Sequence, residues 1–388
     1  MKKQMDIVIV GGGSTGTSIA FHLAKLGIKD VFLLEKEYVA GGTTGKSSAI
    51  IRQHYSNEVT AEMALESLRF FQNFQSIVGG PCDFRNTGFL VCVGPEMTEG
   101  MHANVKLQRN VGINTRILSM DELRLLEPQM FVDDIGAVAY EPDSGYADPS
   151  TTANSFATAA QRLGVEVYTK TEATDILTSA GRIRGLVTNN GEITCNKVVF
   201  ATNIWTNRIA EKLGDNIPIE PTRHPMCLFL RPKTFGKEHA ILIDFINQIY
   251  LRPEVGEQTW VGSLENTPDL IDPNKYNENV DFETTIMYSE RFTRRYPVME
   301  AGDFVRGYAG PYDVTPDWHP ILGRSRVVEG VYWAVGFSGH GFKLSPAVGR
   351  MMTELICKGH SDNIDFFRLS RFEEGKPIKA KYAYSVIA

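Results

Sequence analysis

Three glycines near the N-terminus have the spacing of a turn that binds a dinucleotide. Gly11, Gly13 and Gly16 follow directly on the apolar run 7–10. In such a turn the first glycine permits a tight bend, the second lets the backbone approach a pyrophosphate, and the third lets helix and strand pack closely. The helix that follows would point its N-terminal N–H groups at the phosphates.

An acid stands where the ribose of such a ligand would lie. Glu35 follows a second apolar run, 31–34, about 20 residues beyond the glycines. Residues 19–24 place apolar side chains on one helical face, and Gly27 is a helix-ending signal. Because a carboxylate suits a free 2′-hydroxyl, the pattern favours FAD or NAD over NADP. The turn alone does not separate FAD from NAD, and an ordinary glycine turn is the structural alternative.

A second glycine-rich turn, near the C-terminus, carries a lysine. Residues 336–343 read Gly-Phe-Ser-Gly-His-Gly-Phe-Lys and follow an apolar strand at 330–335. Ser345 and Pro346 predict the start of a helix. A helix N-terminus together with Lys343 would stabilise the negative charge that develops at N1 and O2 of a flavin on reduction. The alternative is a plain tight turn with a solvated lysine.

A third segment of small residues ends in an arginine. Residues 41–52 read Gly-Gly-Thr-Thr-Gly-Lys-Ser-Ser-Ala-Ile-Ile-Arg. Dense N–H and hydroxyl donors with little bulk suit a flavin ring lying along the segment, and the apolar residues at its end argue against a flexible surface loop. Arg52 beside a buried stretch is a natural clamp for a carboxylate, because its planar fork matches two oxygens. A surface ion pair is the alternative.

Two kinds of segment must position these residues. The 388 residues suggest two domains. Residues 222–320 hold short strands, prolines and aromatics, which is typical of a mostly antiparallel sheet, whereas the flanking regions alternate helix and strand. We predict an α/β fold with a Rossmann-like cofactor-binding domain at 1–85, 146–220 and 317–388, and an inserted α+β substrate domain with a mixed or antiparallel sheet at 86–145 and 221–316. Across both domains we expect helices at 60–78, 119–127 and 148–163. We expect strands at 86–94, 165–168, 184–187, 197–201, 227–230, 249–252 and 259–264.

Composition excludes several classes of protein. The net charge of −6 offers no basic footprint for a nucleic acid. No apolar run approaches the ~20 residues that a membrane span needs, and the N-terminal apolar run is too short for a signal peptide. The five cysteines are an odd number without a Cys-x-x-Cys pair, so we expect reduced thiols, a cytoplasmic location and no metal site.

Taken together, these segments resemble the D-amino-acid-oxidase-like flavoprotein superfamily. The nearest group contains sarcosine oxidase, including its heteromeric beta-subunit form, dimethylglycine dehydrogenase and the dye-linked proline dehydrogenase beta subunit. The likeness runs from about Asp6 to about Gly375. The motifs that carry it are 7–16, Thr-Gly-Lys-Ser-Ser-Ala-Ile-Ile-Arg-Gln at 44–53, Asn86-Thr87-Gly88, Ala147-Asp148-Pro149, Thr315-Pro316-Asp317 and 336–343.

The resemblance implies that the Rossmann-like domain is an FAD-binding domain of the glutathione-reductase/D-amino-acid-oxidase type. It also implies a carboxylate-bearing substrate. It matches Arg52 and Lys343 to the pair that holds the substrate carboxylate, and it places Tyr250 and Tyr312 near the substrate pocket. The implied contacts to noncovalently bound FAD come from Gly11, Gly13, Ser14, Thr15, Gly16, Glu35, Lys36, Thr43, Thr44, Ser47, Ser48, Ala173, Gly339, His340, Gly341, Phe342 and Lys343.

The sequence departs from the group where relatives attach their flavin. Monomeric sarcosine oxidases use a cysteine before the Thr-Pro-Asp segment, but residues 308–312 contain none. Dimethylglycine dehydrogenases use a histidine in the segment matching 43–46, which is absent here, and no histidine lies between His102 and His224 to carry an FMN. We therefore expect no covalent tether at these positions.

A further departure concerns oxygen. Sarcosine oxidases place a lysine over the flavin to activate oxygen, on a strand resembling 258–264, but this strand has Trp260 and no basic residue. We therefore expect a dehydrogenase rather than an oxidase, with a second subunit or an external carrier as electron acceptor.

The expected reaction is oxidation of a small secondary or tertiary amino acid, such as sarcosine, proline or dimethylglycine. Hydride transfer to flavin N5 would leave an imine. His54 and His340 are candidate bases, although a lone histidine is more often structural. One alternative is a dehydrogenase of a 2-hydroxy acid or glycerol 3-phosphate, and another is a beta subunit that is active only in a heteromeric electron-transferring complex.

Overall fold

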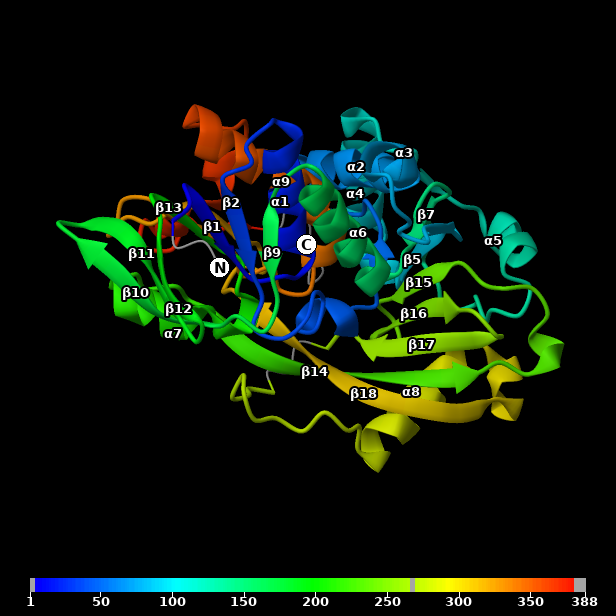
Figure 1. Ribbon diagram of the computed structural model, residues 1–388. Coiled ribbons are helices and arrows are strands. Elements are labelled where there is room, and N and C mark those ends of the chain that lie inside the picture. The colour runs from blue at the N-terminus through cyan, green and yellow to red at the C-terminus, as the bar shows by residue number, and fades with distance from the viewer. Residues whose placement is uncertain (1–3, 266–268, 380–388) are drawn as a thin grey trace.

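The apolar runs 7–10 and 31–34 become central strands of a six-stranded sheet (Figure 1). The computed structural model describes residues 4–265 and 269–379. Strand β1 (Ile7–Val10) pairs in parallel with β2 (Val31–Leu34) on one side and with β13 (Lys197–Phe200) on the other. The sheet order is β19-β20-β13-β1-β2-β9. Its edge strands are β9 (Glu166–Tyr168) and β19 (Ile321–Arg324). Strand β20 (Val331–Val335) lies between β13 and β19, and β19 runs antiparallel to it.

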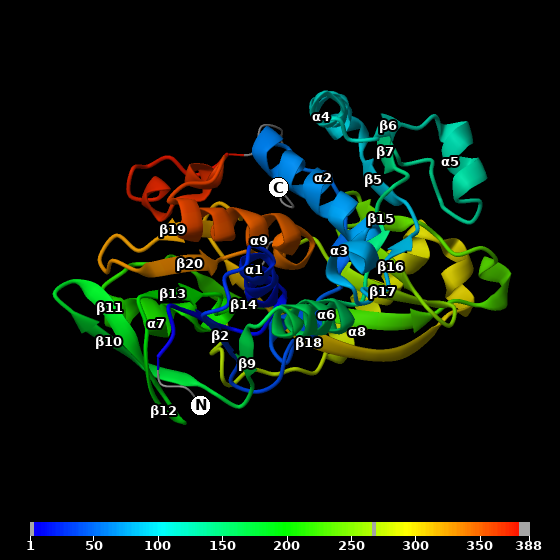
Figure 2. The same ribbon diagram turned by 45° about the horizontal axis from the view of Figure 1, so that its top comes forward.

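Alternate side chains of β1 enter two different cores, as the pleat of a strand requires. Ile7 and Ile9 pack on the face covered by helices, where α1 and α9 lie against each other (Figure 2). Val8 and Val10 pack on the opposite face, against a small antiparallel sheet. The helices are α1 (Ser14–Lys25), α2 (Glu58–Gln72), α6 (Pro149–Arg162) and α9 (Gly341–Lys358), and the opposite face carries β10 (Ala173–Ser179), β11 (Arg182–Thr188), β12 (Gly191–Thr194) and α7 (Thr206–Leu213).

The glycines of the first turn are fixed by close backbone contacts. Gly11 has a φ of +113°, and a Cβ added to it would lie 2.3 Å from the carbonyl oxygen of Ala201. A Cβ on Gly16 would lie 1.9 Å from the carbonyl oxygen of Gly11, so this residue lets α1 pack on β1. Gly13 faces the side chain of Thr44, whose Oγ1 would lie 2.8 Å from an added Cβ.

The middle of the chain forms an eight-stranded, mostly antiparallel sheet in the order β18-β14-β17-β16-β15-β5-β7-β6. The long strands β14 (Glu220–Leu230) and β18 (Asp303–Val314) run along its edge (Figure 1). Because β15 pairs in parallel with β5, the sheet is mixed. Its other strands are β5 (Phe89–Val93), β6 (Arg116–Ile117), β7 (Ala137–Glu141), β15 (Ile241–Asp244), β16 (Ile249–Glu254) and β17 (Gln258–Ser263).

Shorter elements complete the described chain. A further small sheet joins β3 (Ile50–Ile51), β8 (Gly145–Tyr146) and β4 (Arg85–Asn86). No helix within residues 4–265 and 269–379 is both long and apolar enough to cross a bilayer. The remaining helices are α3 (Phe74–Val78), α4 (Thr98–Val111), α5 (Met120–Leu126) and α8 (Phe282–Arg295), with 3₁₀ turns η1 (Thr43–Lys46), η2 (Pro95–Met97), η3 (Asn203–Trp205), η4 (Lys233–Phe235), η5 (Pro297–Ala301), η6 (Ile364–Phe367) and η7 (Leu369–Arg371).

The start of the last helix differs from the prediction. Helix α9 begins at Gly341, with His340 as its N-cap, instead of at Ser345 and Pro346. A proline lacks the backbone N–H, so Pro346 removes a hydrogen bond from the second turn without ending the helix there. Lys343 consequently lies in the first turn of α9 and not in the preceding loop.

Two other predicted elements are interrupted. The helix expected at 60–78 begins at Glu58, capped by the Asn57 side chain, and breaks at Asn73 into α2 and α3. The strand expected at 86–94 is divided into β4 and β5, because Gly88 takes a φ of +73° between them. The proposed division into two domains stays a prediction.

Candidate active site

Three neighbouring cavities, each sharing lining residues with the next, lie beside the glycine turns and are together called the channel. The first, cavity A, contains Glu35 and shares Gly13 and Thr44 with the second, cavity B. Cavity B shares Tyr312 and Gly339 with the third, cavity C. Apart from Gly16, which serves packing, every residue predicted for the cofactor or substrate lines this channel. Cavity A takes Gly11, Gly13, Glu35, Lys36, Thr43, Thr44 and Ala173; cavity B adds Ser14, Thr15, Ser47, Gly341 and Phe342; cavity C holds Ser48, Arg52, Tyr250, Tyr312, Gly339, His340 and Lys343.

Cavity A has the chemistry of an adenosine site. The buried Glu35 accepts hydrogen bonds from the N–H groups of Gly12 at 2.7 Å and Glu37 at 2.9 Å. Each carboxylate oxygen can accept more than one hydrogen bond, so capacity for a ribose hydroxyl remains. Lys36 lies over the ring of Trp205, with its Nζ 3.6 Å from the ring centroid. Sequence reasoning did not find this tryptophan, which is the last residue of a 3₁₀ turn.

Cavity B has the chemistry of a pyrophosphate site. Helix α1 carries no acid in its first turn, and Gly13 at its N-cap supplies no capping side chain. The N–H of Ser14 donates to Thr44 Oγ1 at 3.0 Å, which fixes the segment 43–46 against this helix. A helix N-terminus that is bordered by hydroxyl groups and has no acid in its first turn suits an anion, because its N–H groups and dipole favour negative charge.

The C-terminal glycine turn is held by a buried acid that sequence reasoning missed. Asp313 accepts hydrogen bonds from the N–H groups of Gly336 at 2.7 Å, Phe337 at 3.0 Å and Ser338 at 3.2 Å. Burial raises the pKa of Asp313 to about 6, although these hydrogen bonds act in the opposite direction. The sequence signal that could have revealed Asp313 is its position as an acid in the otherwise uncharged end of a strand, directly after Tyr312.

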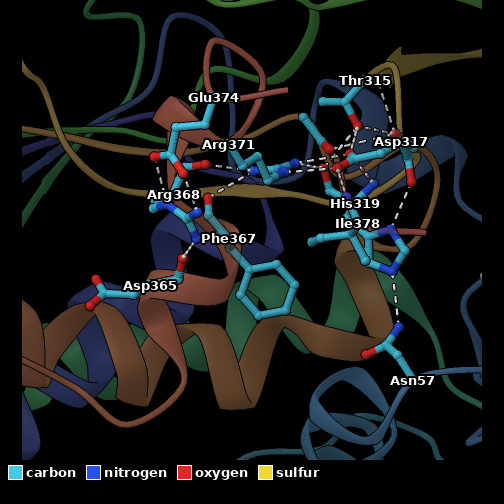
Figure 3. A network of polar contacts seen from close by, with 12 residues as sticks. Asn57, Thr315, Asp317, His319, Asp365, Phe367, Arg368, Arg371, Glu374 and Ile378 are labelled. Atoms are coloured by element: carbon cyan, nitrogen blue, oxygen red, sulfur yellow. Dashed lines mark hydrogen bonds and ion pairs between the residues drawn. The ribbon is translucent and has the colours of Figure 1, made fainter. Parts of the chain in front are cut away.

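The Thr-Pro-Asp motif anchors the C-terminal segment (Figure 3). Arg371 donates to both oxygens of Asp317, at 2.8 and 2.9 Å, and to the carbonyl oxygen of His319 at 2.9 Å. Thr315 donates from Oγ1 to the same carbonyl at 2.8 Å. The His319 ring reaches the side chain of Asn57, the cap of α2, at 3.1 Å. The motif therefore has a structural role: it binds the C-terminal segment and contacts the glycine turn through the hydrogen bond from Thr315 N–H to Ser338 Oγ.

Arg52 and Lys343 line the same cavity, as the resemblance implies. Arg52 follows β3, is 3% exposed, and places its guanidinium 4.5 Å from the centroid of the Tyr55 ring. Its NH1 donates to the carbonyl oxygen of His54. Lys343 is 7% exposed, and burial together with the charge of Arg52 lowers its pKa well below the ordinary lysine value.

A buried acid holds the backbone next to Arg52. Glu141 accepts from the N–H of Gln53 at 2.9 Å and from Ser144 Oγ at 2.6 Å. Burial raises the pKa of Glu141 to about 7. His54 lies with its Nδ1 3.8 Å from this carboxylate and its Nε2 3.0 Å from Asn104. His54, a candidate base, is absent from the described lining of cavity C. It instead helps to position Arg52, which donates to its carbonyl oxygen.

Aromatic and apolar groups form the rest of cavity C. The hydroxyl groups of Tyr250 and Tyr312 share a hydrogen bond, and the Tyr312 ring stacks on His224 with the centroids 3.8 Å apart. The acid in the described lining, Glu265, is paired with Arg291 at 2.5 Å. Apolar walls come from Ile50, Ile243 and Leu264.

The strand predicted to lack an oxygen-activating lysine becomes β17. Trp260 is buried there, donates to Glu254 at 3.3 Å and packs edge-on against Tyr308. It does not belong to the described lining of cavities B and C.

Comparison with known proteins places this fold and site in a family. The profile of FAD dependent oxidoreductases matches residues 6–355, so the chain belongs to that family. L-proline dehydrogenase from P. horikoshii is 30% identical, with a TM-score of 0.91 over 97% of this chain and 100% of that one. Sarcosine oxidase subunit beta from Rhodobacter capsulatus is 26% identical over 99% of this chain and 92% of its own length. Mitochondrial sarcosine dehydrogenase from Homo sapiens is 26% identical over 92% of this chain, which spans 40% of that protein.

The family identifies the protein as an FAD-dependent enzyme, and the channel fits that cofactor. Cavity A offers a carboxylate to a ribose, cavity B offers a helix N-terminus to a pyrophosphate, and the turn at 336–341 borders the junction of cavities B and C.

Proposed function

We propose that this protein oxidises a small secondary or tertiary amino acid of the sarcosine, proline or dimethylglycine type. The observation that carries the proposal is the presence of Arg52 and Lys343 in one buried cavity that continues into the FAD channel. Two cationic side chains suit a carboxylate, and the apolar walls suit an N-alkyl or ring carbon. Similarity to proteins named for proline and sarcosine supports the same class.

The side chains of cavity C would orient the substrate. FAD, when bound, accepts a hydride equivalent and so converts the C–N bond of the substrate to an imine. Arg52 and Lys343 hold the carboxylate, which directs the carbon beside the amine toward the junction of cavities B and C. Tyr250 and Tyr312 close the cavity and exclude water. Such orientation of two reactants is worth up to ~7–11 kcal/mol of a barrier.

We further infer that FAD is held without a covalent bond at the positions that relatives use. Residues 308–312 lie in β18 and contain no cysteine, and η1 at 43–46 contains no histidine. Lys46 of η1 is instead paired with Tyr276 at 2.7 Å and with Glu278. Acid precipitation should release the flavin into the supernatant; flavin that stays in the pellet would contradict the inference.

We propose that the reduced flavin passes its electrons to a carrier or a partner subunit instead of to oxygen. Strand β17 carries no basic residue, whereas the resemblance places an oxygen-activating lysine on this strand in sarcosine oxidases. The second candidate, a subunit of a heteromeric complex, is favoured by the similarity to sarcosine oxidase subunit beta over 92% of that chain. Dye reduction by the chain purified alone, compared with oxygen consumption, separates these outcomes.

The test of the substrate class is anaerobic reduction of the FAD-loaded protein. Sarcosine, proline and dimethylglycine are added separately, with lactate and glycerol 3-phosphate as the competing class. Loss of visible flavin absorbance with at least one amino acid, and with neither hydroxy compound, is expected. Reduction by lactate or glycerol 3-phosphate alone would overturn the proposal.

A further inference from the structure

Lys343 is a buried amine without an acidic partner. Within residues 4–265 and 269–379 no carboxylate forms an ion pair with it, and its close charged neighbour is Arg52. The acids nearest this cavity are engaged elsewhere, since Glu265 is bound to Arg291 and Glu141 to Gln53 and Ser144. A charged ammonium in such surroundings is disfavoured by burial and by the like charge.

We propose that Lys343 is the base that takes the proton from the substrate's ammonium group before oxidation. The inference rests on the proposed function, because an amino acid enters as a zwitterion and must lose this proton to give up a hydride equivalent. In the step, an N–H bond of the substrate ammonium breaks and its electron pair stays on the substrate nitrogen. A new N–H bond forms on Lys343 Nζ, whose own lone pair accepts the proton.

The other polar groups of cavity C are weaker candidates for this role. Burial, together with the charges of Lys343, Arg52 and His319, lowers the pKa of His340 well below its ordinary value. Burial lowers the pKa of His224 to about 4 and raises that of Tyr250 well above its ordinary value. A neutral lysine amine is intrinsically a stronger base than an imidazole.

The carboxylate of the substrate would drive the transfer. When an anion lies against Arg52 and Lys343, it offsets the charge of Arg52 and raises the affinity of Lys343 for a proton. The substrate ammonium is itself disfavoured in this cavity by burial. One proton therefore moves from substrate to protein, and the resulting lysine ammonium pairs with the carboxylate.

Proton uptake on binding of a carboxylate without an amine tests the proposal without turnover. Tetrahydrofuran-2-carboxylate, a ring of proline size, is titrated calorimetrically into the FAD-loaded protein in buffers of different ionisation enthalpy. We expect uptake of about one proton per site in the wild type and none in Lys343→Met or Lys343→Arg. Lys358→Arg, at an exposed lysine of the same helix, is the matched control and should retain the uptake.

The outcomes separate this proposal from the proposed function. Binding without proton uptake in the wild type, or uptake that persists in Lys343→Met, overturns the role of Lys343 and leaves the carboxylate clamp intact. A carboxylate that does not bind overturns the clamp, and the base role with it.

The pH profile of Lys343→Arg supplies a second readout. Arginine keeps the positive charge for the carboxylate but cannot accept a proton. We expect KM to change little, whereas kcat at pH 7 falls by ~100-fold or more and rises about tenfold per pH unit as the ammonium of the bound substrate titrates. A variant with wild-type kcat and an unchanged pH profile would contradict the proposal.

Discussion

Two cationic side chains in one cavity have different surroundings, and the difference suits different tasks. Arg52 has a backbone carbonyl and an aromatic ring as partners, and an arginine side chain remains charged in proteins. Lys343 has neither acid nor carbonyl partner among the described residues and is the one whose charge can change. Arg52 is thus suited to hold an anion, and Lys343 to exchange a proton.

Replacement of Arg52 by alanine should weaken substrate binding and spare the cofactor. A hydrogen bond to a charged group contributes ~1.5–3 kcal/mol, so the apparent KM should rise by ~10–100-fold. Flavin content should be unchanged, because Arg52 lines cavity C and neither A nor B in the described structure. Steady-state kinetics measures KM, and visible absorbance measures the flavin content of the variant. An unchanged KM would contradict the proposal that Arg52 binds the substrate carboxylate.

Glu141 predicts a pH dependence of stability. Its folded pKa of about 7 lies above the ordinary value of 4.5, so the folded state binds the proton more tightly than the unfolded state. Stability from this group is therefore full below about pH 4.5 and is lost as pH rises to about 7, by at most ~3 kcal/mol. Glu141→Gln should remove this loss. Unfolding in denaturant at pH 5 and pH 8 compares the two proteins, and equal pH slopes would contradict the assignment.

At the scale of elements, helix α9 is flanked at each end by a glycine with positive φ. Of these two glycines, Gly339 lines cavity C and Gly359 does not. A Cβ on Gly339 (φ +84°) would lie 2.4 Å from the ring of Tyr312. A Cβ on Gly359 (φ +87°) would meet its nearest neighbour, Arg324, at 3.5 Å. Each replacement by alanine strains the backbone by ~1–3 kcal/mol, but only one displaces a wall of cavity C.

Gly339→Ala and Gly359→Ala therefore form a matched pair. Both should lower the melting temperature, and Gly339→Ala alone should lower FAD content or raise KM. Thermal unfolding and flavin absorbance of the two variants test this. Equal effects on the site from both would show that the turn at 336–341 has no special relation to it.

The sequence predicted elements where a local signal dominated. The apolar run 7–10, the three glycines and Glu35 predicted the first βαβ unit, because strand burial, turn sterics and helix periodicity act within a few residues. The start of α9 was misplaced because Ser345 and Pro346 form a strong local signal. The actual helix start at Gly341 depends on the turn that Asp313 holds from 23 to 25 residues away. Such long-range hydrogen bonds leave no periodic trace in the chain.

At the scale of the whole molecule, the channel is assembled from distant segments. Strand ends near Gly11, Ala201 and Tyr312 meet around cavity B, and β3 brings Arg52 beside the first turn of α9. The resemblance supplied the individual site residues, but their convergence depends on the packing of two sheets. Asp313, Trp205 and Glu141 act through that packing, which is why sequence reasoning missed them.

The C-terminal anchor predicts a large effect on stability from a residue outside the channel. Arg371→Met would leave the buried Asp317 without its cation and should cost ~3–5 kcal/mol. The double variant Asp317→Asn with Arg371→Met should be less destabilised, since no buried charge remains unpaired. Chemical denaturation of the three proteins tests the coupling; additive losses would show that the pair contributes little as a pair.

The central claim is that two distant glycine turns hold one FAD, beside a cavity in which Arg52 and Lys343 share a carboxylate. The most direct test is a crystal structure of the protein with FAD and tetrahydrofuran-2-carboxylate bound. The account predicts FAD extended from Glu35 through cavity B, with the carboxylate between the guanidinium of Arg52 and Nζ of Lys343. FAD elsewhere, or a carboxylate bound away from both side chains, would contradict it.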